Sequence, residues 1–444
     1  MKYRAYPKYK DSGVEWLGKV PEHWDVKAIK WETPVQRGAS PRPIDDPIYF
    51  DDEGEYAWVR ISDVTSAGMY LRNTTQRLSE LGSSLSLKLN DGEIFLSIAG
   101  SVGKPCITSI KCCIHDGFVY FPKWKGDKRF LFYLFECGEP YKGLGKLGTQ
   151  LNLNTDTVGS IVTGFPQFQE QVSLADFLDR ETDKIDTLLG KKRTLIEKLK
   201  EKRTALISRT VTRGLPPDAA RAAGLEPHPK LKPSGVEWLG DVPELWEVKA
   251  IKWETAVQRG ASPRPIDDPI YFDDEGEYAW VRISDVTSAG MYLRSTTQRL
   301  SDLGSSLSVK LNPGEIFLSI AGSVGKPCIT VIKCCIHDGF VYFPKWKGDK
   351  RFLFYLFECG EPYKGLGKLG TQLNLNTDTV GSIIAGFPPL IEQNVICDFL
   401  DQATTKIDQL IAKVEAAIDR LQEYRTALIT AAVTGKIDVR GTVQ

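Results

Sequence analysis

The sequence lacks several features that mark large classes of proteins. No stretch is long and apolar enough to cross a membrane, and the opening MKYRAYPKYKDSG lacks the apolar run of a signal peptide. The 444 residues include nine cysteines, an odd number, and no Cys-x-x-Cys pair. We therefore expect reduced thiols in a cytoplasmic protein, not a disulfide framework.

Motifs that would carry catalysis are also missing. An amino-methyltransferase needs an Asn/Asp-Pro-Pro-Tyr/Phe loop, and the nearest run, 386–390, reads GFPPL. The run SIAGSVGK at 97–104 lacks the spacing and the Ser/Thr of a phosphate-binding P-loop. Cys112, Cys113 and His115 are close together, but alternate residues of a strand face opposite ways, which favours buried thiols over zinc. We expect a non-catalytic chain without a metal.

Net charge is absent as well, because 57 basic residues balance 57 acidic ones. Residues 31–165 contain 14 Lys/Arg and 16 Asp/Glu, and six of these acids lie between Asp45 and Glu55. Many DNA-binding proteins are basic. If this chain binds DNA, either its basic groups gather on one face or a partner supplies much of the phosphate contact.

The chain does contain a long internal repeat. Residues 31–161 return at 253–383 with an offset of 222, and the 131 positions differ at only six, namely Pro34/Ala256, Asn73/Ser295, Glu80/Asp302, Leu87/Val309, Asp91/Pro313 and Ser109/Val331. Each copy has strand-like runs at 56–64, 92–100 and 112–121, a short helix with a polar turn within 71–89, and a buried helical run at 128–144. The repeat predicts two α+β domains that read the same chemical surface.

A long amphipathic stretch follows each copy. Apolar residues recur in steps of seven over 168–213, with Leu188 and Leu195 as the +3 positions and Leu189 and Ile196 beside them, and the pattern returns after the second copy. A 3.5-residue average favours a supercoiled helix pair. The predicted pairing residues are Leu178, Ile185, Leu199, Leu206, Leu400, Ile407, Val414, Leu421 and Leu428.

Four motifs occur twice, in the same order. They are SGVEWLG-x-VPE-x-W, GTQLNLNTDTVGSI, EQ-x5-FLD-x4-KID and RTALI-x3-VT, and a single TGKIDVR follows at 434–440. This set resembles the specificity subunit of type I restriction–modification systems. The resemblance implies two tandem α+β target-recognition domains separated by two long helices, packed as an antiparallel coiled coil with pseudo-twofold symmetry.

The expected domains follow from this resemblance together with the composition. They are an N-terminal extended arm (1–20), target-recognition domain 1 (21–165), spacer helix 1 (166–213), a Pro/Gly/Ala-rich linker (214–235), target-recognition domain 2 (236–387), spacer helix 2 (388–435) and a C-terminal tail (436–444).

The resemblance also implies the partners. The chain would bind double-stranded DNA and dock two modification subunits on its helices, in a system that serves anti-phage defence. Those subunits methylate adenine N6 with S-adenosylmethionine, and translocating nuclease subunits that use ATP and magnesium join when restriction is active. No cofactor is expected in this chain. The alternative from the residues alone is a coiled-coil scaffold without DNA readout.

Family members usually carry two different recognition domains and read an asymmetric bipartite site. Here the domains are nearly identical, and a rotation of roughly 180° between them would match the local twofold axis of duplex DNA. We therefore expect an interrupted palindrome whose half-sites are about 34 Å apart, which is one helical turn.

Candidate DNA contacts are Arg, Lys, Gln and Ser side chains in loops. The loop 36–42 reads either as a DNA contact or as an ordinary polar loop, 97–104 as a contact or a tight turn, and 142–154 as a contact or a capping segment. The candidates are Gln36, Arg37, Ser40, Arg42, Arg60, Arg72, Arg77, Ser101, Lys104, Lys142, Lys146 and Gln150, with copies Gln258, Arg259, Ser262, Arg264, Arg282, Arg294, Arg299, Ser323, Lys326, Lys364, Lys368 and Gln372.

Overall fold

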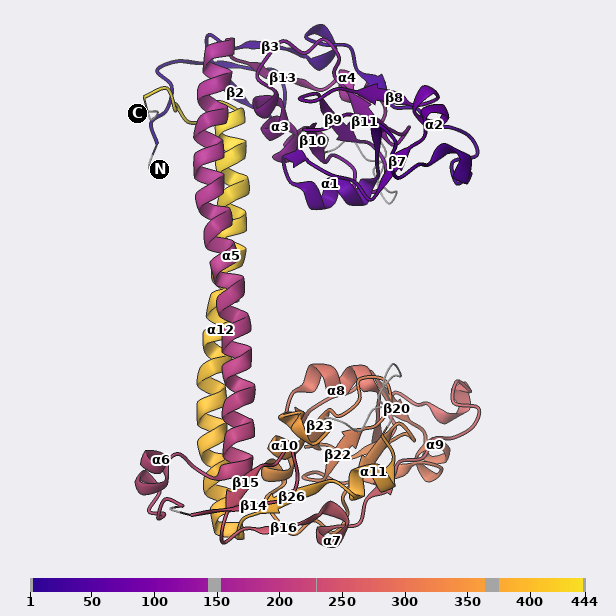
Figure 1. Ribbon diagram of the computed structural model, residues 1–444, viewed down its shortest axis with the longest axis vertical. Helices are drawn as coiled ribbons and strands as arrows, with labels where there is room; N and C mark the ends of the chain where they lie inside the picture. The colour runs from indigo at the N-terminus through magenta and orange to yellow at the C-terminus, as the bar shows by residue number, and fades with distance from the viewer. Residues whose placement is uncertain (1–2, 143–152, 229, 364–374, 442–444) are drawn as a thin grey trace. The chain divides into compact units, whose positions relative to one another are not determined.

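The computed structural model describes residues 3–142, 153–228, 230–363 and 375–441 (Figure 1). These residues form two compact units. Unit 1 comprises Met1–Lys192 and Glu415–Gln444, and unit 2 comprises Arg193–Val414. Within the described ranges, no helix is both long and apolar enough to span a membrane.

Two long helices contribute to both units, as predicted. Helix α5 (Phe168–Arg213) has 46 residues and α12 (Leu390–Val433) has 44. In unit 1, the first part of α5 packs antiparallel on the last part of α12, and one core cluster holds Leu178 and Ile185 together with Leu428. In unit 2, the last part of α5 packs on the first part of α12, with Ile207 and Leu400 in one cluster.

The seam between the helices differs from the prediction at two positions. Leu188 and Leu195 are 42% and 44% exposed, whereas Leu189 and Ile196 are only 5% and 7% exposed. The buried residues lie four places after positions 185 and 192, not three. Both spacings occur in a heptad repeat, in which the residues that face the partner helix alternate in steps of three and four. Five of the nine predicted pairing residues are buried, and the other four, Leu199, Leu206, Val414 and Leu421, are partly buried.

The same ion pair crosses the seam in each unit. Arg425 Nε lies 3.0 Å from Asp186 Oδ1 in unit 1, and Arg203 Nε lies 3.0 Å from Asp408 Oδ1 in unit 2. Both the arginines and the aspartates are related by the offset of 222, which fits the predicted pseudo-twofold pairing of the helices.

The recognition domain of unit 1 is built on two mixed sheets beside the helix pair (Figure 1). The larger sheet has the order β4 (Gln36–Arg37), β12 (Phe118–Tyr120), β9 (Ile94–Ser97), β10 (Pro105–Thr108) and β6 (Tyr70–Leu71). The smaller sheet has the order β7 (Gln76–Leu78), β5 (Tyr56–Val59), β11 (Cys112–Ile114) and β8 (Leu87–Leu89). A two-stranded ladder joins β3 (Asp25–Ala28) to β13 (Val162–Phe165). The helices are α1 (Ile61–Ala67), α2 (Glu80–Ser84), α3 (Lys128–Glu136) and α4 (Thr155–Gly159).

Three predicted elements need correction. The run 56–64 is a strand only to Val59, because the carboxylate of Asp63 accepts the Arg60 backbone N–H and starts helix α1 there. The run 112–121 is two strands, β11 and β12, separated by a turn. The helical run 128–144 ends at Glu136, after which Gly138 takes a positive φ of 74°.

The N-terminal segment is folded, not an extended arm. Its β1 (Tyr9–Asp11) and β2 (Lys19–Pro21) form an antiparallel hairpin, and Leu17 and Val20 are buried. The Lys436 ammonium donates to the Leu17 carbonyl at 2.9 Å, so the end of the chain holds the hairpin. The polar composition of residues 1–20 predicted an extended arm. The buried side chains of Leu17 and Val20 instead attach this segment to the rest of unit 1.

Unit 2 repeats the recognition domain with the offset of 222. Its larger sheet is β17 (Gln258–Arg259), β25 (Phe340–Tyr342), β22 (Ile316–Ser319), β23 (Pro327–Thr330) and β19 (Tyr292–Leu293), and its smaller sheet is β20 (Gln298–Leu300), β18 (Tyr278–Val281), β24 (Cys334–Ile336) and β21 (Val309–Leu311). The two-stranded pairs are β14 (Leu231–Pro233) with β15 (Asp241–Pro243), and β16 (Glu247–Ala250) with β26 (Ile384–Phe387). The helices are α6 (Pro217–Ala222), α7 (Ile251–Glu254), α8 (Ile283–Ala289), α9 (Asp302–Ser306), α10 (Lys350–Glu358) and α11 (Thr377–Gly381).

Candidate nucleic-acid interface

The loop 36–42 is clamped onto the turn between β11 and β12. Arg37 donates from Nε to the Asp116 carbonyl oxygen at 2.6 Å, and Arg42 donates from a terminal nitrogen to the Asp116 carboxylate at 2.7 Å. The Ser40 hydroxyl donates to the other carboxylate oxygen at 3.3 Å. One aspartate thus holds three predicted DNA contacts in a single group.

The backbone of this group permits little change. A Cβ added at Gly38 would lie 2.1 Å from the His115 carbonyl oxygen, so a side chain cannot be accommodated without movement. The Ala39 N–H donates to the Ile114 carbonyl at 3.1 Å. In unit 2, Arg259, Ser262 and Arg264 bond to Asp338 in the same way, at 2.6, 3.1 and 2.6 Å.

His115 supports the turn in its neutral form. Its Nδ1 accepts the Gly117 N–H at 2.9 Å. Burial lowers the pKa of His115 more than the nearby Asp116 carboxylate raises it, and the pKa of His337 in unit 2 is lowered for the same reason. Protonation would therefore break a hydrogen bond and charge a buried ring.

We expect stability to depend on these two histidines in acid. An unfolded histidine has a pKa of about 6.5, so below that pH the unfolded chain binds protons that the folded ring resists. Their contribution is complete above that pH and is lost as the pH falls. A chain with His115→Asn and His337→Asn keeps an acceptor near Nδ1 but cannot titrate. Urea unfolding at pH 7 and pH 5 should show a smaller loss for this variant than for the parent chain, and equal losses would contradict the expectation.

The segment 97–104 is a closed turn in the structure. The Gly103 N–H donates to the Ser97 carbonyl at 2.8 Å, and the Lys104 N–H donates to the Ser97 hydroxyl at 2.9 Å. These amides are therefore occupied and cannot cradle a phosphate. The Ser101 carbonyl accepts the Ser97 hydroxyl, which agrees with the tight-turn interpretation, and the side chains of Ser101 and Lys104 stay predicted contacts.

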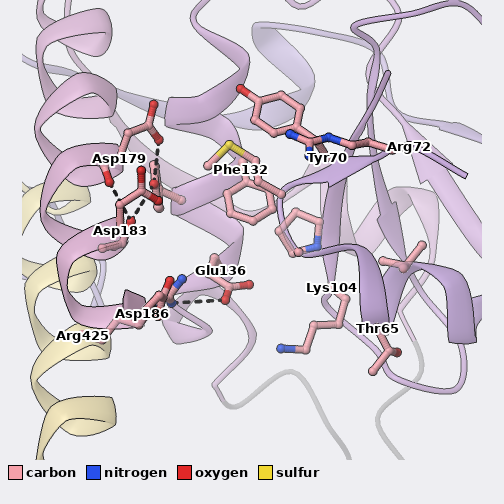
Figure 2. A pocket seen from close by; sticks show the side chains of 16 residues that line it. Thr65, Tyr70, Arg72, Lys104, Phe132, Glu136, Asp179, Asp183, Asp186 and Arg425 are labelled. Atoms are coloured by element: carbon pink, nitrogen blue, oxygen red, sulfur yellow. Dashed lines mark hydrogen bonds and ion pairs between the residues drawn. The ribbon is translucent and has the colours of Figure 1, made fainter. Parts of the chain in front are cut away.

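Lys104 and Arg72 line a cavity of about 520 Å³ between the recognition domain and the helix pair of unit 1 (Figure 2). Its opposite wall carries more acidic than basic groups, with Asp179 and Asp183 on α5, Glu136 on α3 and Arg425 on α12. A similar cavity of about 430 Å³ in unit 2 is lined by Lys326. Because carboxylates repel phosphate, the interior of these cavities does not suit a DNA backbone.

The remaining predicted DNA contacts differ in the hydrogen bonds and ion pairs that they make within the protein. Gln36 Oε1 accepts the Tyr120 hydroxyl at 2.7 Å, and Lys142 pairs with Glu139 at 2.7 Å. Arg77 donates to the carbonyls of Gly54 and Glu55, so it holds the acidic segment in place. Arg60 precedes helix α1, and the copies of Gln36, Arg60 and Arg77 in unit 2, Gln258, Arg282 and Arg299, are placed in the same way. Lys146, Gln150, Lys364, Lys368 and Gln372 lie outside the described residues.

Several other polar or aromatic side chains near these loops have structural roles. Trp124 is 8% exposed and donates to the Asp127 carbonyl at 3.2 Å, so it covers the core. All nine cysteines are buried, and burial raises the pKa of Cys113 to about 12. Asn154 accepts the Thr157 N–H at 2.8 Å and caps α4. Among the described residues, no group of three or more His, Cys, Asp or Glu could hold a metal ion.

Each unit also has a groove beside the last turns of a long helix. In unit 1 the groove lies against α12 at Ala427 and Thr430 and is bounded by Trp16 and Glu139. In unit 2 it lies against α5 at Thr204, Ala205 and Ser208, with charged residues of the same helix such as Lys200 and Arg209 beside them, and it is bounded by Trp238 and Glu361. Their volumes are about 780 and 860 Å³. Small side chains on the helix leave room there for a partner.

Asp116 was missed as a site residue by the sequence analysis. The sequence pattern predicts one strand over 112–121, and Asp116 would have no special role in the middle of a strand. The His-Asp-Gly sequence at 115–117 is a turn signal that would have divided this run. Its contact with the loop 36–42, from more than 70 positions away, has no sequence signal of its own.

Comparisons with known proteins agree with this architecture. The MjaVIII specificity subunit, from a type I restriction enzyme of Methanocaldococcus jannaschii, is 24% identical over 446 residues, which is 95% of each chain. The MjaIX specificity subunit of the same organism is 24% identical over 206 residues, covering 45% of this chain and 46% of that protein.

Solved structures share the fold. A chain from a study of complex assembly and conformational transition of the type I restriction–modification system has a TM-score of 0.65 and 16% identity, covering 96% of this chain and 99% of its own. The HsdS subunit from Thermoanaerobacter tengcongensis has a TM-score of 0.52 and 16% identity, covering 94% and 98%.

The most direct comparison is with a family model. The model for the type I restriction modification DNA specificity domain matches residues 22–198 and again residues 243–420, once in each repeat. These two matches cover most of the chain, including both recognition domains and much of both long helices. The chain therefore belongs to the type I restriction–modification DNA specificity family.

Proposed function

We propose that this chain is a non-catalytic specificity subunit that reads an interrupted palindrome in double-stranded DNA, one half-site with each recognition domain. The observation that carries this proposal is the pair of equivalent groups around Asp116 and Asp338. Each holds two arginines and a serine of the same kind, with bond lengths that agree within 0.2 Å. Two equal readers select equal half-sites.

The inverted order of the half-sites follows from the antiparallel helices. In each unit, the start of one long helix packs against the end of the other, and the ion pairs of Arg425 and Arg203 repeat this arrangement. If the same symmetry relates the two recognition domains, it would match the twofold relation between DNA strands. Such a site offers one adenine on each strand.

The grooves at Ala205 and Ala427 support docking of two modification subunits, one for each unit. These subunits would methylate adenine N6 with S-adenosylmethionine. They would also supply part of the phosphate contact, because this chain has no net positive charge. Restriction subunits that use ATP and magnesium would join the same complex.

The proposal is tested by co-expressing the chain with its modification subunit and sequencing the host DNA for N6-methyladenine. We expect one interrupted palindrome, methylated on both strands. An asymmetric bipartite motif would contradict the equivalence of the two domains. Absence of methylation, together with purified complex that fails to protect any duplex, would favour a coiled-coil scaffold instead.

A further inference from the structure

The arginines of the loop 36–42 retain free hydrogen-bond donors at the surface. Arg37 bonds through Nε alone, and in the described part of the chain its two terminal nitrogens make no other hydrogen bond or ion pair. Arg37 belongs to strand β4, which pairs with β12, so its backbone is fixed. A guanidinium anchored at Nε presents two parallel N–H groups to a ligand.

The neighbouring carboxylate argues against phosphate as that ligand. Asp116 is 38% exposed at its side chain and lies 2.7 Å from Arg42. In unit 2, the pKa of Asp338 is lowered: burial opposes this, but the Ser262 hydrogen bond and the charges of Arg264 and Arg259 outweigh it. A phosphate bound here would face an ionised carboxylate. An uncharged base edge would not be repelled in this way.

Among base edges, guanine fits the two parallel donors. Its O6 and N7 are adjacent acceptors in the major groove, whereas adenine and cytosine each present an amino donor and thymine a single acceptor. The Asp116 carboxylate beside the arginine could accept from a cytosine amino group, which also suits a G·C pair.

We propose that Arg37 reads a guanine in the major groove of its half-site, and that Arg259 reads the equivalent guanine in the other. Asp116 and Asp338 are positioning residues, because they hold the loops and disfavour phosphate. This inference rests on the proposed function, and it adds that each half-site contains a G·C pair at mirrored positions.

The test uses the purified complex with its modification subunit and duplexes that carry the site methylated in the host. Each half-site guanine is replaced in turn by 7-deazaguanine, which lacks N7. At one guanine per half-site, we expect the wild-type methylation rate at limiting enzyme to fall by roughly 5- to 150-fold, the usual discrimination of a bidentate contact.

A variant with Arg37→Lys and Arg259→Lys keeps the charge but loses the fork. We expect it to methylate the normal duplex more slowly by a similar factor, and to respond little to 7-deazaguanine. The matched control is Arg221→Lys, because Arg221 pairs with Asp218 on exposed helix α6, away from the recognition domains. Circular dichroism and co-purification with the modification subunit show whether each variant folds and assembles.

Three results would overturn the inference while leaving the proposed function intact. These are a methylated motif without guanine in its half-sites, a wild-type rate that no 7-deazaguanine lowers, and a lysine variant with the wild-type rate, which would show that the guanidinium fork is not needed. If the wild-type complex methylates no sequence, the proposed function itself fails and the inference fails with it.

Discussion

A chain with Ala205→Glu and Ala427→Glu should leave host DNA unmethylated when it is co-expressed with the modification subunit. Both alanines are exposed and line the grooves beside the long helices. Glutamate would fill the space left by small side chains and place a charge where a partner must exclude water. An unpaired buried charge costs about 3–5 kcal/mol, which weakens binding at each groove by at least about 100-fold.

The matched control is Ala412→Glu, an exposed position of α12 that lines neither groove. It adds the same charge to the same kind of helix surface. Methylation sequencing and co-purification with the tagged modification subunit give the readout. If the double variant assembles and methylates as well as the control, the grooves are not the docking sites.

Replacing Glu170 by alanine should destabilise unit 1 by roughly 3–5 kcal/mol, because it removes a buried carboxylate that satisfies several donors. The Tyr6 hydroxyl donates to it at 2.8 Å and Trp24 Nε1 at 3.1 Å, while His23 Nε2 lies 2.8 Å away. Burial, together with the bond to Glu170, raises the pKa of Tyr6, which keeps the hydroxyl a donor. Alanine would leave the Tyr6 hydroxyl and the Trp24 N–H buried without this acceptor.

The Glu170→Gln variant keeps the shape of the side chain but removes its negative charge, so it shows how much of the stabilisation depends on charge. It retains one oxygen for Tyr6 and Trp24 and should cost only about 1–2 kcal/mol. The exposed Glu201→Ala serves as the control. Urea unfolding gives the free energy, and hydrogen exchange of peptides from residues 3–24 shows whether the hairpin opens first. A Glu170→Ala chain as stable as the control would contradict the proposed role of the carboxylate.

Unit 2 contains an equivalent buried carboxylate, Glu392, which allows the same prediction to be tested a second time. Glu392 accepts from Trp246 Nε1 at 3.2 Å and lies 2.5 Å from His228 Nε2, and His228 occupies the position equivalent to Tyr6. The carboxylate is thus retained while its partner changes from a phenol to an imidazole. Glu392→Ala should therefore destabilise unit 2 to a similar extent.

The sequence by itself determined the features that depend on local periodicity and on identity between repeats. A heptad pattern needs no distant contact, so a long helix was predicted over 166–213, and α5 runs from Phe168 to Arg213. Six differences in 131 positions imply two copies of one domain, whatever its detailed fold. The doubled motifs likewise indicated the family before any geometry was known.

The tertiary structure decided which side chains meet across long stretches of chain. Leu189 and not Leu188 faces the partner helix, because helix phase depends on how the two helices supercoil. Asp116 joins Arg37 and Arg42 only because β12 lies beside β4. The same holds for Glu170 and Tyr6, which are 164 positions apart. Such contacts arise from strand register and helix packing, and neither is encoded by residues near the site.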